Sequence, residues 1–296
     1  MGLTDNEFML ELNGVRHWVR VAGAIHNTMP LVVVHGGPGG MVYTLEHTIG
    51  PRLESFCTVV YYEQRGSGRS EAALDQASYT VVQLIADLEA LRLALNLGRI
   101  NLFGFSFGAE LALEYAAAYP LAVHRVVASS PGSIFGSRLE AVQLNNFENL
   151  ARDEMLEQVR GVRDLLISTG NQLDRIWQMM DGPTVDRFLF QDANAAKLTR
   201  ANWDEFEQRF PMHDMGEHFD WFNRSSRHAL EVLPCVLATT LVTCGLFDRN
   251  SGVDINRDVA TLIPNSRFVL FEHSAHFPEI EEPERFETVI KTFLEM

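Results

Sequence analysis

The sequence predicts an α/β protein in which helices flank a mostly parallel sheet and one helical segment is inserted into the chain. Three observations lead to this prediction. Residues 1–130 alternate short apolar runs with a long helical pattern, as strands joined by crossover helices do. Strand-like runs then disappear between about 135 and 231, where charged helical patterns replace them. The strand and helix patterns return after Pro234, so we interpret the middle segment as an inserted helical cap.

Short apolar runs between turn residues mark the expected strands. The first two runs are joined at Asn13-Gly14, a strong hairpin signal, so the sheet should open with an antiparallel pair. The segment LVVVHGG, residues 31–37, begins with four apolar residues in a row, which is typical of a strand covered on both faces. Eight strands are expected in all, at about 8–12, 15–22, 31–35, 57–62, 100–105, 124–130, 240–245 and 267–272.

Helical spacing is clearest in three places outside the inserted segment. Residues 79–97 repeat apolar side chains at helical intervals and end at Gly98, a common helix stop. The run AELALEYAAAY, residues 109–119, predicts a helix directly after a strand. Pro283 suits the first turn of a C-terminal helix.

Composition indicates a globular protein of the cytoplasm. Hydrophobic residues make up 46% and charged residues 21% of the 296 positions, which excludes the disordered and fibrous classes. No apolar run approaches the roughly 18 residues that a membrane-spanning helix needs. The first ten residues, MGLTDNEFML, have neither the basic nor the apolar region of a secretory signal.

Charge and cysteine content limit the partners that we expect. The formal net charge of −15 repels phosphate backbones, so nucleic acid is not the expected partner, whereas a cationic small substrate would be attracted. The three cysteines, Cys57, Cys235 and Cys244, are odd in number and widely spaced, which predicts neither a disulfide framework nor a zinc site. No cofactor and no metal are expected.

The segment Gly104-Phe105-Ser106-Phe107-Gly108 is a G-x-S-x-G motif placed directly between a predicted strand and a predicted helix. A nucleophile elbow requires that context, because a sharp turn there lifts the serine above the carboxyl end of the strand. Small residues two positions before and after the serine let the strand and helix approach each other. We therefore expect Ser106 to be a nucleophile.

The glycine-rich segment from His35 to Gly40 follows another predicted strand. Glycines there let the backbone approach a substrate oxygen, so we expect the amides of Gly37 and Phe107 to form an oxyanion hole. A phosphate-binding loop is the competing interpretation. It is disfavoured because the G-x-x-x-x-G-K-[ST] pattern is missing and Pro38 removes an amide.

A serine nucleophile needs a histidine base held by a carboxylate, and the expected chain order is Ser, acid, His. Asp248 follows the predicted strand at 240–245, and His276 follows the last strand after a short loop of small residues. His273 is the competing base, although it abuts the strand. Two further acids, Asp254 and Asp258, are weaker candidates because they lie in a segment expected to begin a helix.

Several segments in this order resemble the α/β-hydrolase superfamily and, within it, the proline iminopeptidase-like group. They are HGGPGG, YYEQRGSGRS, GFSFG, GLFD and SAHFPEIEEPERF. The resemblance covers residues 1–134 and 232–296, the two parts of an α/β-hydrolase core, and leaves 135–231 as the cap. The family usually has Asp-Gln-Arg-Gly where this chain has Glu63-Gln64-Arg65-Gly66. The resemblance implies that Glu63 and Arg65 brace the active-site loops.

The cap resembles the family less closely. Aminopeptidases of this group bind a free amine with cap carboxylates, and the nearest pattern here is Trp203-Asp204-Glu205, which a solvated helix face would also explain. Glu205 is thus a candidate amine anchor, with Trp203 beside it. The aromatic residues Trp221 and Phe222 are expected in the cap core or in an apolar substrate pocket. His213 and His218 are five residues apart, which disfavours a helical metal site.

These motifs together predict a serine hydrolase that cleaves an acyl bond through an acyl-enzyme on Ser106. Two substrate classes remain open. The family motifs favour release of an N-terminal residue, often proline, from a short peptide. The divergent cap favours an ester or lactone of a small molecule, as in macrolide esterases and lactonases of the superfamily. A non-catalytic receptor of the same fold is the third alternative.

Overall fold

The computed structural model describes residues 2–211, 213–219 and 229–295. Its centre is an eight-stranded sheet in the order β1-β2-β4-β3-β5-β6-β7-β8. The pairs β1/β2 and β2/β4 are antiparallel and the other pairs are parallel. The sequence predicts the first antiparallel pair and a mostly parallel sheet, but not the antiparallel pairing of β2 with β4. The strands are β1 (Asn6–Leu12), β2 (Val15–Ala22), β3 (Leu31–Val34), β4 (Val59–Tyr62), β5 (Ile100–Phe105), β6 (Val123–Ser129), β7 (Thr239–Gly245) and β8 (Ser266–Phe271).

The antiparallel opening of the sheet follows from its turn. Asn13 and Gly14 have φ angles of 47° and 78°, and a two-residue hairpin turn of type I′ needs positive φ at both positions. The turn sets a register in which Leu12 pairs with Val15. The predicted hairpin is therefore confirmed.

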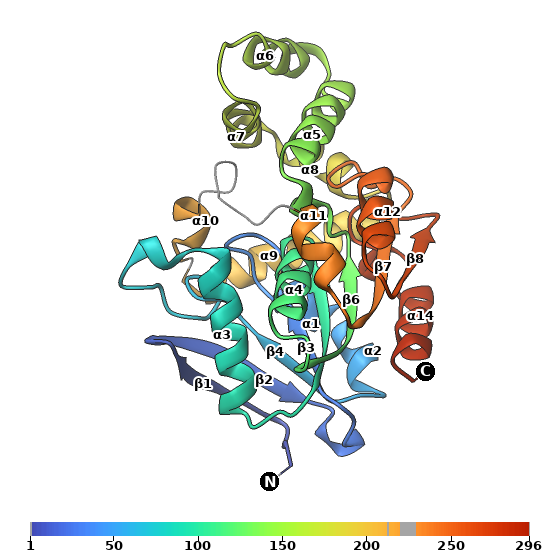
Figure 1. Cartoon of the computed structure of the whole chain (residues 1–296). Coiled ribbons are helices and arrows are strands. Elements are labelled where there is room, and N and C mark those ends of the chain that lie inside the picture. The colour runs from blue at the N-terminus through green and yellow to red at the C-terminus, as the bar shows by residue number, and fades with distance from the viewer. Residues whose placement is uncertain (1, 212, 220–228, 296) are drawn as a thin grey trace.

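Helices cover both faces of the sheet because its central strands are apolar on both sides. Along β3, Val32 and Val34 belong to one hydrophobic cluster, and Leu31 and Val33 belong to the other, as the alternation of a strand requires. The first cluster includes residues of α3 (Val81–Ala94), α4 (Phe107–Ala118) and α12 (Val253–Leu262). The second includes residues of α1 (Tyr43–His47), α2 (Gly50–Glu54) and α14 (Pro283–Glu295). Figure 1 shows α3 and α4 in front of the strands.

A run of helices separates β6 from β7. It comprises α5 (Ser137–Leu150), α6 (Asp153–Arg163), α7 (Thr169–Met179), α8 (Gly182–Leu189), α9 (Ala193–Arg209), α10 (Met215–His218) and α11 (Ala229–Val232). In Figure 1 the helices α5, α6 and α7 rise as a lobe above the sheet. We propose that residues 135–231, which include α5 to α10, form the cap. The remaining short elements are α13 (Pro278–Glu281) and 3-10 turns at Ala24–His26, Gln76–Ser78, Gly132–Phe135 and Leu233–Cys235.

Helices α9 and α10 contact the core of the protein directly. The amide of Met215 in α10 donates to the carbonyl of Gly66 at 3.1 Å, and Gln76 donates to Asp214 at 2.9 Å. Helix α9 packs against α1, where the Tyr43 and Phe206 rings meet edge to face, 5.4 Å apart. The segment between β6 and β7 is thus docked beside the loops that follow β3 and β4.

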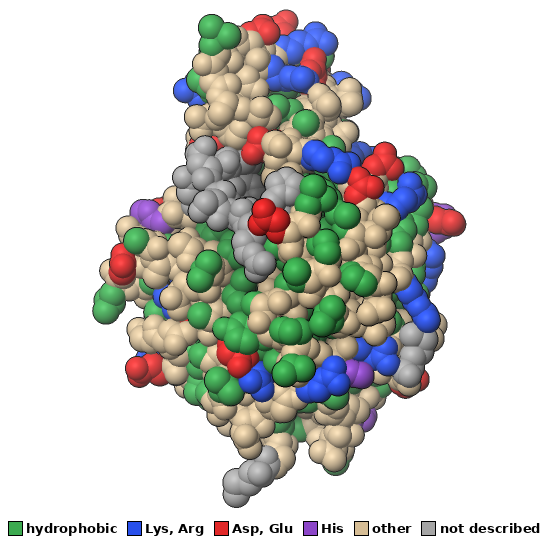
Figure 2. All heavy atoms as spheres, viewed as in Figure 1, with side chains coloured by type: hydrophobic (Ala, Val, Ile, Leu, Met, Phe, Trp, Pro, Cys, Tyr) green, Lys and Arg blue, Asp and Glu red, His purple; other side chains and the backbone are tan. Residues whose placement is uncertain are grey.

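Acidic and basic side chains are interspersed over the face in Figure 2, including the lobe of α5 to α7. The net negative charge is therefore not gathered into one patch on that face. Within the described residues, no helix is both long and apolar enough to cross a membrane. Cys57 and Cys244 are buried free thiols, as expected from their apolar surroundings in the sequence, and Cys235 is an exposed free thiol.

A substitution at Gly108 can test how tightly α4 packs on β3. A Cβ atom at this position would lie 2.1 Å from the carbonyl oxygen of Val34, so Gly108→Ala should lower the free energy of unfolding by about 3 kcal/mol, as overpacking of a core does. The matched control is Gly161→Ala in α6, where no atom lies within 4 Å and the better helix former should add up to about 1 kcal/mol. Chemical denaturation measures both variants. Equal effects of the two substitutions would contradict the packing argument.

Candidate active site

Ser106 occupies a strained turn between β5 and α4. Its φ and ψ are 51° and −120°, a region that residues with a side chain rarely adopt. The turn is held because the Ser106 amide donates to the carbonyl of Ser129 at 2.8 Å. A Cβ atom at Gly104 would lie 2.4 Å from the carbonyl oxygen of Gly108, so no larger residue fits there without a shift. The local geometry is that of the nucleophile elbow that the motif predicts.

The structure brings together the serine, histidine and aspartate that we prefer from the sequence. His276 Nε2 lies 3.1 Å from Ser106 Oγ. On the other side of the ring, Nδ1 lies 3.1 Å from each carboxylate oxygen of Asp248. Both His276 and Asp248 are buried, with 3% and 5% of their surface exposed. The three side chains follow β5, β7 and β8, whose carboxyl ends share one edge of the sheet.

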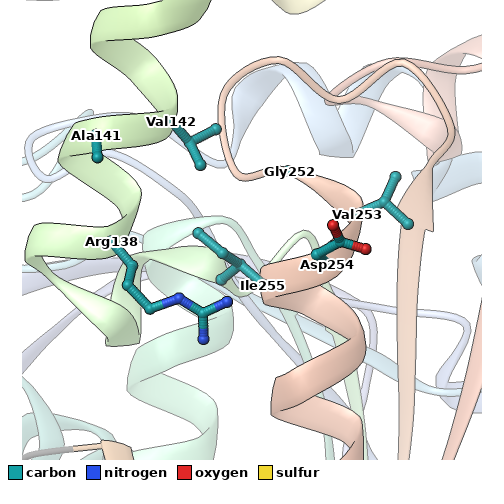
Figure 3. Close-up of a pocket in the computed structure, with 7 residues that line it drawn as sticks. All are labelled: Arg138, Ala141, Val142, Gly252, Val253, Asp254 and Ile255. Carbon is teal, nitrogen blue, oxygen red and sulfur yellow. The ribbon is translucent and has the colours of Figure 1, made fainter.

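The competing candidates lie elsewhere. His273 is exposed, and its amide donates to Glu282. Asp258 pairs with Arg138 at 2.8 Å, and the side chain of Asp254 is 89% exposed. Figure 3 shows Asp254 at a separate hollow of about 420 Å³ between α5 and α12. That hollow is lined by Arg138, Ala141, Val142, Gly252, Val253, Asp254 and Ile255, and it includes none of the three preferred side chains.

Asp248 is held as an anion by a set of hydrogen-bond donors. The amides of Asn250 and Ser251 donate to its Oδ1 at 3.0 and 2.9 Å, and the Ser251 hydroxyl donates to Oδ2. Burial alone would raise the pKa of this carboxyl, but the charge of His276 and these hydrogen bonds lower it below the ordinary value. An ionised Asp248 can fix the tautomer in which His276 donates from Nδ1 and accepts at Nε2.

The glycine-rich turn after β3 is held by a neutral buried histidine. His35 Nδ1 donates to the Gly36 carbonyl at 2.7 Å, and Nε2 accepts from the Gln64 amide at 3.1 Å. Burial lowers the pKa of His35 to about 4, so it stays uncharged at neutral pH. The turn lies against the elbow, since a Cβ atom at Gly36 would meet Ser106 Cβ at 3.3 Å. Gly37 is next in this turn and lines the cavity beside Ser106.

Glu63 and Arg65 connect the loop after β4 to two different parts of the core. Glu63 is fully buried and accepts from the Val42 amide at 3.2 Å and from the Arg69 guanidinium at 3.0 Å. It thereby ties the chain after the glycine turn to the loop after β4. Arg65 makes a bidentate pair with Asp87 of α3, at 2.6 and 2.7 Å. These contacts agree with the bracing that the family resemblance implies.

A cavity of about 360 Å³ opens beside Ser106 and His276. Most of its wall is apolar, and the polar groups are few. The lining comprises Gly36, Gly37, Gly40, Met41, Thr44, Leu45, Phe105, Ser106, Leu189, Trp203, Glu207, Asn250, His276 and Phe277. A mostly apolar cavity with a few polar side chains is typical of small-molecule binding sites.

Of the two candidate substrate-binding residues on α9, Trp203 lines the cavity and Glu205 does not. The carboxylate of Glu205 accepts from the Tyr43 hydroxyl and from Arg209, both at 2.8 Å. The acidic side chain at the cavity is Glu207, which the sequence analysis missed. Its spacing of four residues from Trp203 on α9 could have revealed it, because residues four apart share a helix face. Trp221 and Phe222 lie outside the described residues.

Among the described residues, no group of three or more His, Cys, Asp or Glu side chains could hold a metal ion. His218, singled out in the sequence, instead has its Nε2 2.8 Å from the side-chain nitrogen of Gln76. This contact belongs to the docking of α10 on the core.

Glu279 is a second buried carboxyl close to Asp248, and no motif in the sequence predicts it. It is fully buried in α13, directly after the loop that carries His276. Ser129 donates to its Oε2 at 3.2 Å, and its Oε1 has no hydrogen-bond partner within the described chain. Burial raises the pKa of Glu279 to about 8, with smaller contributions from the negative charges of Glu281 and Asp248. Glu279 is therefore mostly protonated at neutral pH.

Comparison with known proteins gives consistent results. Residues 29–283 match the family described as alpha/beta hydrolase fold. A proline iminopeptidase of Heyndrickxia coagulans is 29% identical over 275 residues, which cover 90% of each chain. The crystal structure of a proline iminopeptidase from Mycobacterium smegmatis superposes with a TM-score of 0.77 at 21% identity, over 98% of each chain. The crystal structure of an enol-lactonase from Burkholderia xenovorans LB400 superposes with a TM-score of 0.72 at 19% identity. The superposition covers 98% of this chain and 100% of the enol-lactonase chain. The two structural likenesses show a shared fold.

Glu279 gives the stability of the protein a predictable pH dependence. The carboxyl has a pKa of about 8 in the folded protein and 4.5 as the ordinary value, so the folded state binds more protons between these limits. The free energy of unfolding should therefore fall as pH rises from about 4.5 to 8. Glu279→Gln removes this contribution. Urea denaturation at several pH values should show the variant gaining stability relative to the parent as pH rises, and a constant difference would show that Glu279 does not titrate in this range.

Proposed function

We propose that this chain, which belongs to the α/β-hydrolase fold family, is a serine hydrolase with Ser106, His276 and Asp248 as its catalytic residues. The observation that carries the proposal is the continuous contact from Asp248 through His276 to Ser106. A receptor that had lost catalysis would have no need to keep this arrangement on a strained turn. The names of the curated relatives, proline iminopeptidases among them, also indicate a hydrolase.

The reaction begins with proton transfer inside this contact. Ser106 Oγ attacks the substrate carbonyl carbon while His276 Nε2 takes the hydroxyl proton, and Asp248 stabilises the imidazolium that forms. The carbonyl oxygen becomes negative, and we propose that the amides of Gly37 and Phe107 donate to it. His276 then protonates the leaving group, and the acyl-enzyme remains on Ser106. Water, deprotonated by His276, attacks this ester and restores the serine.

We propose that the substrate is a short peptide with a free N-terminal amine, from which the first residue is released. Glu207 supports this choice, because it adds a carboxylate to a cavity that also contains Ser106 and His276. Glu207 is exposed, so a protonated amine that enters the cavity can reach its carboxylate and pair with it. The apolar wall, with Phe105, Leu189 and Phe277, suits a small apolar side chain or ring such as that of proline.

An ester or lactone of a small molecule is the second candidate. The apolar character of the cavity favours it, since most of the lining side chains offer no hydrogen bond to a peptide. In this case Glu207 would have no amine to bind, and turnover would not depend on a charged group next to the scissile bond.

Ser106→Ala tests the reaction class. The substitution removes the nucleophile, so hydrolysis of a nitrophenyl ester should fall by at least about 10⁴-fold, in line with losses measured when a catalytic serine is removed. Covalent labelling by a serine-directed phosphonate should disappear as well. The parent protein is the control, and its failure to react with the phosphonate while folded would contradict the serine-hydrolase proposal.

Glu207→Gln tests the substrate class. Loss of the charged partner should lower kcat/KM for a proline anilide with a free amine by about 10- to 100-fold, the worth of a hydrogen bond to a charged group. Turnover of simple esters should change little. Glu205→Gln is the matched control, because that carboxylate faces Tyr43 and Arg209 and should leave the preference for a free amine intact. A parent enzyme that cleaves blocked and free anilides equally well would favour the ester or lactone candidate.

A further inference from the structure

A chain of side-chain hydrogen bonds runs from the helices above the sheet to the imidazole of His276. Trp177 in α7 donates from its indole nitrogen to Gln143 Oε1 at 3.3 Å. Gln143 in α5 donates from Nε2 to Asn250 Oδ1 at 2.6 Å. Asn250 Nδ2 in turn lies 2.9 Å from His276 Nε2. Gln143 is buried, and Asn250 lines the cavity beside Ser106.

Trp177, at the end of this hydrogen-bond chain farthest from His276, determines which atoms along it donate and which accept. An indole N–H can only donate, so the oxygen of the Gln143 amide must face Trp177. The nitrogen of Gln143 then faces Asn250 and requires an oxygen there. The nitrogen of Asn250 is left facing His276, so an N–H donor points at the imidazole. Reversing Asn250 alone would place its NH₂ against the donor of Gln143.

Two donors therefore share one acceptor. Nδ1 of His276 is directed at the carboxylate of Asp248, which leaves Nε2 with a single lone pair in the ring plane. Asn250 Nδ2 at 2.9 Å and Ser106 Oγ at 3.1 Å both approach it. Catalysis needs the proton of Ser106 on this lone pair. Once Nε2 is protonated, the N–H of Asn250 would face another N–H, so it has to turn away before or during proton transfer.

We propose that Asn250 is a positioning residue that restrains His276 as a base, and that α5 sets the restraint through Gln143. This inference rests on the proposed role of His276 as the general base. It connects the proposed cap to the chemistry, because a displacement of α5 would release the amide of Asn250 from Nε2. A substrate oxygen in the cavity could also accept the Asn250 N–H and free the lone pair for Ser106.

Two substitutions at Asn250 change the restraint in opposite directions. Asn250→Leu keeps the approximate size and removes the competing N–H, so phosphonate labelling of Ser106 should become about fivefold faster, which is the worth of one neutral hydrogen bond. Asn250→Asp can still accept from Gln143 but presents a carboxylate oxygen to Nε2. It should hold a proton on that nitrogen and slow labelling by about tenfold or more, since charge-assisted hydrogen bonds are stronger.

If Asn250 had a purely structural role, both substitutions would slow labelling. A faster rate for Asn250→Leu together with a slower rate for Asn250→Asp is therefore the decisive readout.

Gln143→Met tests the part of the hydrogen-bond chain that is farther from His276. Without the donor of Gln143, the Asn250 amide is free to turn, and labelling should again become faster. The matched control is Asn146→Leu, since Asn146 also connects α5 to this loop but donates to the Arg249 carbonyl, at 2.8 Å. Its labelling rate should equal that of the parent.

The outcomes separate this inference from the proposed function. Labelling of the parent that Ser106→Ala abolishes supports the serine hydrolase. If Asn250→Leu then reacts at the parental rate or more slowly, the proposal that Asn250 restrains His276 is wrong, and the catalytic assignment stands. If the folded parent does not react at all, both proposals fail. Faster labelling of Asn250→Leu and Gln143→Met, with slower labelling of Asn250→Asp, supports the restraint.

Discussion

The close approach of three backbone segments around Ser106 is the constraint on which the site depends. A side chain at Gly104 would meet the Gly108 carbonyl, one at Gly108 would meet the Val34 carbonyl, and one at Gly36 would crowd Phe105 and Ser106 itself. Because the glycines leave this space free, β3, β5 and α4 meet where β5 ends. The positive φ of Ser106 is then sustained by packing on several sides, and its hydroxyl is lifted toward His276.

The parallel sheet brings the partners of Ser106 to the same place. Strands β5, β7 and β8 end at one edge, so the loops after them can meet although Ser106 and His276 are 170 residues apart in sequence. The loop after β7 is short and supplies its own amide donors to Asp248. The His276 amide donates to the Leu189 carbonyl at 2.9 Å, which fixes the loop after β8 against the end of α8. Ser106, Asp248 and His276 are therefore each oriented by backbone contacts that their own loops make.

Sequence patterns predict the parts of this site that local rules govern. Strand runs, the hairpin at Asn13-Gly14 and the elbow motif follow from the residues in a short window, and the structure has each of them. Glu207 and Asn250 were missed because their positions at the cavity depend on how α9 and the Asp248 loop dock. The sequence favours Glu205 for its place beside Trp203, yet two residues along a helix turn a side chain to a different face. Contacts between distant segments carry this information, and composition and periodicity do not.

The two buried carboxyls near His276 show how local donors decide charge. Asp248 accepts from two backbone amides, a serine hydroxyl and the imidazole, so its anion is retained despite burial. Glu279 has the Ser129 hydroxyl at one oxygen, and its pKa is raised to about 8. A second anion would compete with Asp248 for the charge of the imidazolium and would cost desolvation without a partner. Of these two buried carboxyls, only Asp248 is therefore mostly ionised at neutral pH.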